Sequence, residues 1–218
     1  MNEDCMKLAQ LSKENCHVKG LHSLVLRPAT NTSGMVRMYI AEPGIDLRGD
    51  LFGPTIAYHC HQYDIQITCI SGVLINHVLT LKDRPADVTE APVIQGWKFS
   101  SQLHGSATPM FSKTATMKMI AKLVITRLEP LDTYEGPSFE YHTVSIPPAG
   151  KEFVSWMVHE KPPTGIYDPT AYSNADLSGL TAEGLYGNMT QERYAALLKN
   201  AMSCMEPDAA ALVSELSK

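Results

Sequence analysis

The chain has 218 residues, of which 44% are hydrophobic and 19% are charged, and its net charge at pH 7 is −5. This composition is typical of a folded globular protein and excludes a globally disordered chain. The acidic balance, with no run of basic residues, argues against a nucleic-acid partner and favours a small-molecule ligand. No apolar stretch approaches the roughly 20 residues that span a bilayer, and the polar N-terminus is unlike a secretory signal. The five cysteines form no CxxC pair, which argues against a disulfide scaffold, so we expect a cytoplasmic protein. Because no apolar stretch is long enough to span a bilayer, we expect no membrane partner.

Short β-like runs separated by Gly, Pro and Asp dominate the sequence after an expected helix over residues 2–13. The expected strands lie within residues 21–28, 35–44, 55–64, 65–72, 73–81, 96–103, 117–128, 140–146 and 152–160. Many short strands with this punctuation are typical of an all-β barrel or sandwich rather than of alternating βα units. Residues 117–128 also suit a helix, but Val124-Ile125-Thr126 favours a strand.

The C-terminal part changes character. Residues after 160 are rich in Pro, Gly, Asp and Asn, which is typical of an extended loop. Thr190 is a candidate N-cap for a helix, and Pro207 suits the first turn of a last helix. We interpret both helices as packing or dimer helices, which leaves the oligomeric state open between a monomer and a homodimer. The organisation that follows is an N-terminal segment over 1–20, a barrel over 21–160 and an extension over 161–218.

Two histidines, His59 and His61, lie one residue apart in the strand-like segment "AYHCHQYDIQITCISG". Successive side chains of a strand point to opposite faces, so these two imidazoles are expected on the same face. Convergent neutral imidazoles suit divalent iron, zinc, manganese or nickel. A third ligand is therefore needed, and His142 is our preferred candidate, with His77 and His104 as alternatives. We expect His17, His22 and His159 to be exposed to solvent.

The segment around these histidines resembles the first signature motif of the cupin superfamily, G(X)5HXH(X)3,4E(X)6G. The matching positions are Gly53, His59, His61 and Gly72, the last of which comes one residue early, while Gln66 stands in place of the acidic residue. The second cupin motif matches at Pro137 and His142 but lacks its glycines and asparagine. The resemblance covers residues 21–160 and implies a cupin-like β-barrel, a double-stranded β-helix, with a metal held by His59, His61 and His142.

Roles for the neighbouring residues follow from the expected site. Gln66 would assist the metal through its amide oxygen or bind a metal-bound water. Asp64 would orient a histidine or form a turn, and Asp64 or Tyr63 would act as a base if one is needed. Tyr63, Asn76 and Trp97 would line the pocket, with a core role as the alternative for Trp97. Arg37 would bind an anion if its face points inward. The apolar residues that alternate with Arg37 favour the opposite arrangement, in which Arg37 lies on the surface.

The chemistry that the resemblance implies is a metal-dependent reaction on a small polar molecule. Three-histidine sites without an acidic ligand look like those of the thiol dioxygenases in this superfamily, so an iron(II) dioxygenase-type reaction is favoured. Three neutral ligands also leave the metal charge to be balanced by an anionic or chelating substrate. The alternatives are an isomerase or lyase that uses zinc or manganese as a Lewis acid, and a non-catalytic barrel that binds a small ligand.

Overall fold

The fold was analysed in a computed structural model, which describes residues 3–30, 33–51, 53–84, 92–99, 109–147, 152–162 and 170–216. The elements in chain order are α1 (Glu3–Leu11), β1 (Lys13–Glu14), β2 (Leu21–Arg27), β3 (Val36–Ala41), β4 (Ile65–Ser71), β5 (Leu74–Asp83), β6 (Val93–Phe99), β7 (Phe111–Leu128), β8 (Thr133–Gly136), β9 (Tyr141–Ser145), β10 (Val154–Glu160), β11 (Thr170–Tyr172), β12 (Gly187–Asn188), α2 (Gln191–Met202) and α3 (Pro207–Leu216). The expected strand over 117–128 is confirmed as the C-terminal part of β7.

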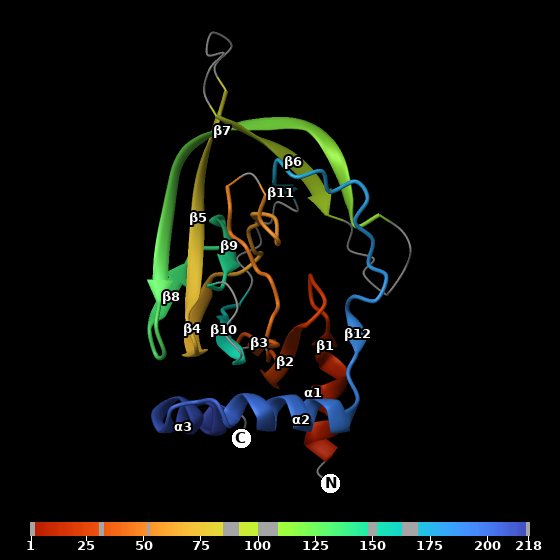
Figure 1. The fold of residues 1–218 in the computed structure, drawn as a ribbon, viewed down its shortest axis with the longest axis vertical. Coiled ribbons are helices and arrows are strands. Elements are labelled where there is room, and N and C mark those ends of the chain that lie inside the picture. The colour runs from red at the N-terminus through yellow and green to blue at the C-terminus, as the bar shows by residue number, and fades with distance from the viewer. Residues whose placement is uncertain are drawn as a thin grey trace.

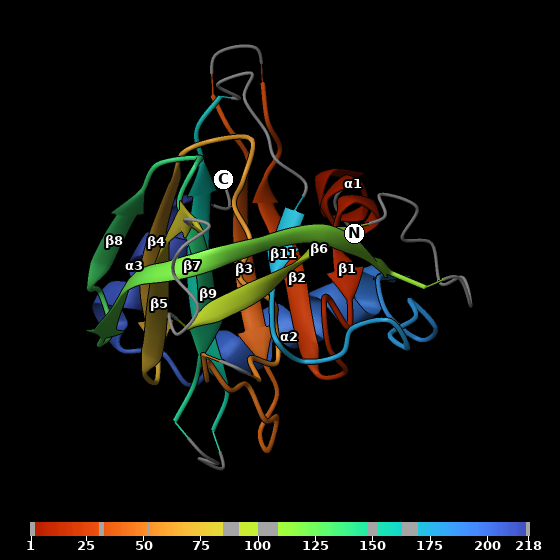
Figure 2. The same ribbon diagram turned by 90° about the horizontal axis from the view of Figure 1, so that it is seen from above.

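Two antiparallel sheets face each other. The first has the strand order β12-β1-β2-β3-β10-β4-β8 and the second has the order β11-β6-β7-β5-β9. The long strand β7 pairs with β6 through its first half and with β5 through its second half, and Figures 1 and 2 show it arching across the first sheet. The predicted fold class is confirmed: an all-β, cupin-like barrel with a short N-terminal helix and C-terminal helices.

The first sheet is covered on both faces. Between the sheets lies an apolar core that includes Leu21, Ile67 and Trp156. On the other face, Met38 and Ile40 of β3 pack against α1, α2 and α3, which lie along that side of the sheet in Figure 1. Because both faces are buried, β2 carries six consecutive buried residues rather than an alternating pattern. The terminal helices therefore serve as packing elements for the barrel.

Helix α2 begins where the sequence predicted. The Thr190 hydroxyl accepts a hydrogen bond from the backbone N–H of Arg193 at 3.1 Å, so Thr190 is the N-cap. Helix α3 begins at Pro207, whose missing N–H is unneeded in a first helical turn.

Residues 55–64 do not form the expected strand. Within this segment only Tyr58 and His59 make β-bridges, to Tyr172 and His142. Tyr172 belongs to β11 and His142 to β9, which are the two edges of the five-stranded sheet. A segment that joins both edges through adjacent residues cannot run alongside either strand, and this explains why the regular strand was wrongly predicted. The two bridges draw the edges of that sheet together.

Candidate metal centre

Three histidines from two distant segments meet at this closure. His59 and His61 come from the irregular segment, and His142 comes from β9. The backbones of His59 and His142 exchange two hydrogen bonds, with N···O distances of 3.0 and 2.9 Å. This reciprocal pair holds both residues at the same level of the barrel. We refer to His59, His61 and His142 as the three-histidine cluster.

The cluster has the dimensions of a metal site. Each residue offers a ring nitrogen, and these atoms all lie within 4.8 Å of one another. The Nε2 atoms of His61 and His142 are 2.9 Å apart. Two nitrogens bound at about 2.1 Å to one ion, at a right angle, lie about 3.0 Å apart. The His61 and His142 nitrogens therefore already have the separation of two ligands on one divalent cation.

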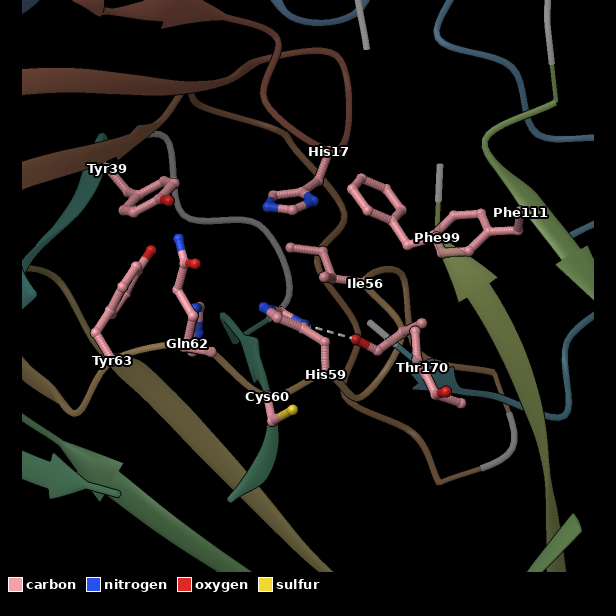
Figure 3. Close-up of a pocket in the computed structure, with 13 residues that line it drawn as sticks. His17, Tyr39, Ile56, His59, Cys60, Gln62, Tyr63, Phe99, Phe111 and Thr170 are labelled. Atoms are coloured by element: carbon pink, nitrogen blue, oxygen red, sulfur yellow. Dashed lines mark hydrogen bonds between the residues drawn. The ribbon is translucent and has the colours of Figure 1, made fainter. Parts of the chain in front are cut away.

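Hydrogen bonds at the far side of two rings select the tautomer that metal binding needs. His59 Nδ1 lies 2.9 Å from the carbonyl oxygen of Ala57, which can only accept; Figure 3 marks this bond with a dashed line. His142 Nδ1 lies 3.0 Å from the side-chain oxygen of Asn76. With the proton on Nδ1 in both rings, each Nε2 is unprotonated and has the lone pair that a metal needs. Such partners fix ring orientation and raise the basicity of a ligand.

Burial keeps these imidazoles neutral. Desolvation lowers the pKa of His142 to about 3, with a smaller effect from His59. Burial also lowers the pKa of His59, and it lowers that of His61 well below its ordinary value. Neutral imidazole is the form that binds metals, so the cluster is ready to bind one at neutral pH.

The cluster lies between a cavity and a smaller apolar pocket. The main cavity has a volume of ≈ 310 Å³ and is lined by His59, His61 and mostly apolar or aromatic residues, among them Tyr39, Ile56, Phe99 and Phe111. Several of these surround one open space in Figure 3. The inner pocket, of ≈ 50 Å³, adds His142, Trp156 and Glu160. Among the described residues that line the main cavity, none carries a formal charge at neutral pH.

A fourth histidine, His17, was wrongly expected to be exposed. His17 lines both the main cavity and the inner pocket, and its ring centroid is 5.9 Å from that of His59. Desolvation lowers its pKa to about 3, with a smaller effect from His59. The pair Asn15 and His17, two residue types that tolerate left-handed backbone, was a signal for a tight turn before β2. It gave no indication that this turn faces the cluster.

Of the residues that follow His61 in the sequence, Tyr63 lies at the main cavity, whereas Gln66 and Asp64 make other contacts. Tyr63 lines the main cavity, and its ring stacks on His61 at a centroid distance of 5.4 Å. The structure does not bring Gln66 to the cluster: its amide points to the outer face of β4 and donates to Glu135 at 3.3 Å. Asp64 accepts a hydrogen bond from the backbone N–H of Ser138 at 2.8 Å. Asp64 therefore holds the loop before β9, which is the turn role considered from the sequence.

Two residues that the sequence predicted in the pocket, Asn76 and Trp97, do not line the main cavity. Asn76 is fully buried and contacts His142 rather than the cavity. Trp97 lies in a small core cluster, and its indole N–H donates to the carbonyl of Ser173 at 2.9 Å. His77 bonds to Ser145 at 2.7 Å beside a different cavity. His104 lies outside the described residues.

Arg37 lies on the inward face of β3, whereas the sequence favoured a position on the surface. Its apolar neighbours Met38 and Ile40 pack against the helices, so Arg37 and Tyr39 face the other sheet. The Arg37 guanidinium forms an ion pair with Glu160, with an Nε–Oε1 distance of 3.0 Å. Because this carboxylate occupies the guanidinium, Arg37 serves to neutralise a buried acid at the inner pocket. His22, another residue expected to be exposed, is buried and contacts Glu42.

Comparisons with known proteins find similar solved structures but no matching sequence family and no matching curated protein. No family model matches the sequence, and no curated protein matches it. The chain is similar to the Drosophila melanogaster CENP-C cupin domain, with 10% identity over 67% of this chain and 73% of that chain and a TM-score of 0.36. It is similar to a cupin domain from Bordetella pertussis, with 15% identity over 66% of this chain and 94% of that chain and a TM-score of 0.32.

A third similar structure is a mutant of the oxalate decarboxylase of Bacillus subtilis, with 14% identity, a TM-score of 0.35 and coverage of 72% of this chain and 29% of that chain. Since all three TM-scores are below 0.5, we take neither a function nor a residue role from these proteins. The assignment of an all-β barrel rests on the strand order and the closure described above. Among the described residues, no helix is long and apolar enough to cross a membrane.

Proposed function

We propose that this protein is a metal-dependent enzyme that acts on a small molecule in the main cavity. The observation that carries the proposal is the convergence of three neutral imidazoles, two with their tautomers fixed for binding, at the wall of that cavity. Three protein ligands leave coordination positions for a substrate, which distinguishes a reactive centre from a structural one. His59, His61 and His142 would hold the ion.

Among the reactions considered, we favour an iron(II) dioxygenase-type reaction. Isomerase or lyase chemistry needs a general base at the substrate. Asp64 is bonded to a loop backbone, and burial raises the pKa of Tyr63 and makes its phenolate a scarce species at neutral pH. Glu160 is paired with Arg37. An iron(II) ion supplies the redox chemistry itself and needs no protein carboxylate as a base.

The lining of the main cavity indicates what kind of molecule fits. Phe99, Phe111 and Ile56 offer apolar contacts, and Tyr39 and Tyr63 add aromatic surface with a polar tip. A substrate with an apolar body and one polar, metal-binding end would satisfy both the walls and the cluster. This protein's own residues would thus bind the body, orient the polar end and exclude water from it.

The test is metal analysis followed by oxygen consumption. Untagged wild-type protein and His142→Ala would be purified without chelators, loaded anaerobically with Fe(II) and analysed for bound metal. We expect about one iron per chain in wild type, none in His142→Ala, and oxygen consumption with small chelating acids, thiols or phenols. Zinc or manganese binding with oxygen-independent turnover would favour the isomerase or lyase. Absence of metal binding in wild type would refute the enzyme proposal and leave a ligand-binding barrel.

A further inference from the structure

The fourth imidazole, His17, comes from outside the barrel strands. It lies in the loop between β1 and β2, and its backbone has φ +68°, in the left-handed region. Asn15 in the same loop has φ +52°. Non-glycine residues adopt this region at an energetic cost, and such strain is concentrated at functional sites. In Figure 3 the His17 ring lies above His59, across the open space from Tyr63.

His17 is held in place by the C-terminal part of the chain. The Tyr186 hydroxyl lies 3.0 Å from His17 Nδ1, and the two rings meet edge to face at a centroid distance of 5.8 Å. Tyr186 is itself left-handed, with φ +53°, and its N–H donates to the Asn15 carbonyl. Just beyond, β1 pairs with β12. We call the segments 13–17 and 186–188 the strap.

The strap determines which nitrogen of His17 carries the proton. The Tyr186 hydroxyl lies at hydrogen-bond distance from Nδ1. We assign the hydroxyl as the donor of this bond, which places the proton of neutral His17 on Nε2. A protonated nitrogen cannot bind a metal, and His17 does not belong to the group of described residues whose ligand atoms converge. Its Nε2–H is a hydrogen-bond donor.

We propose that His17 is a ligand-recognition residue, whose Nε2–H donates to an anionic atom of the small molecule bound at the three-histidine cluster. The strap thereby completes a site that the barrel alone leaves open. This inference rests on the proposed metal site. It fits the lining of the main cavity, in which the described residues include no lysine or arginine to bind an anion. A fixed neutral donor would recognise the anion in their place.

The test measures anion binding at a loaded metal rather than turnover. Wild type, His17→Phe and Tyr186→Phe would be loaded with Co(II), and azide would be titrated while the visible absorption of the cobalt is recorded. Phenylalanine keeps an aromatic ring at position 17 and removes the donor. We expect one cobalt per chain in all three proteins. Azide should bind about tenfold or more weakly to His17→Phe, since a hydrogen bond to a charged group is lost.

Tyr186→Phe should give an intermediate loss, because the imidazole remains but its tautomer is no longer directed. His159→Phe is the matched control: this imidazole contacts Arg27 on β2 and should leave azide binding unchanged. Wild-type azide affinity in both His17→Phe and Tyr186→Phe would overturn the inference while leaving the metal site intact. Loss of cobalt in His17→Phe would overturn it by making His17 a ligand. Absence of cobalt in wild type would refute the proposed metal site itself.

Discussion

A substitution of Asn76 should change the metal affinity of the protein while leaving its fold stability almost unchanged. Asn76 is fully buried on β5, and its side-chain oxygen accepts from His142 Nδ1 at 3.0 Å. Its amide nitrogen has no partner among the described residues. Replacing it by leucine, which has a similar volume, removes the group that orients His142. We expect metal affinity to fall by about 10- to 100-fold, or about 1.4–2.7 kcal/mol, as is typical when such a partner is lost.

The stability of the same variant should change little. Asn76→Leu removes a hydrogen bond worth about 1 kcal/mol and leaves the His142 Nδ1–H unpaired, at a cost of about 1–3 kcal/mol. The substitution also removes the buried, unpaired amide nitrogen of Asn76, which relieves a penalty of about 1–3 kcal/mol. These effects oppose each other, so the free energy of unfolding of the metal-free protein should stay within about 1–2 kcal/mol of wild type.

The assay is competition for Zn²⁺ against a chromogenic chelator, with urea unfolding in EDTA as the measure of stability. Gln66→Leu is the matched control, because it removes an amide of the preceding strand, β4, that points to the outer face and contacts Glu135. Its zinc affinity should equal that of wild type. Wild-type zinc affinity in Asn76→Leu would refute the reasoning that this amide prepares His142. Weakened binding in Gln66→Leu would restore Gln66 to the metal site.

Three other outcomes follow from the structure. Lowering the pH from 7 to 5 should decrease the free energy of unfolding of the metal-free protein by about 2 kcal/mol for each of His17 and His142, whose pKa values burial lowers to about 3. The reason is that these histidines bind protons in the unfolded chain from about pH 6.5 downward but stay neutral in the folded protein. An equal free energy of unfolding in urea at both pH values would contradict this. Thr190→Ala should lower stability by about 1 kcal/mol through loss of the cap of α2, measured as a shift in the urea midpoint, whereas an unchanged midpoint would mean that the cap is not needed. Gly34→Ala should lower stability by about 3 kcal/mol or more, since a Cβ there would lie 1.4 Å from the carbonyl oxygen of Glu160; thermal unfolding at the wild-type temperature would show that the backbone can yield.

Several sequence predictions depended on local rules and were confirmed. Strand propensity identified β7 against its helix-like composition, and capping chemistry located the start of α2 at Thr190. The spacing of His59 and His61, with a third histidine from the second motif, selected three residues that the fold does bring together. Even so, the strand expected for that spacing is absent: the histidines converge because adjacent residues of the segment join two sheet edges.

What the sequence determined by itself was therefore the class of fold and the identity of the convergent histidines, because both are written in short-range patterns of residue type. The tertiary structure decided which way the other side chains face. Alternation along β3 and β4 states which residues share a face but not which face meets the cavity. Helices cover the outer face of the first sheet, so Arg37 points inward and Gln66 outward. The pairing of β1 with β12, about 170 residues apart along the chain, and the contact of Tyr186 with His17 hold His17 beside the cluster.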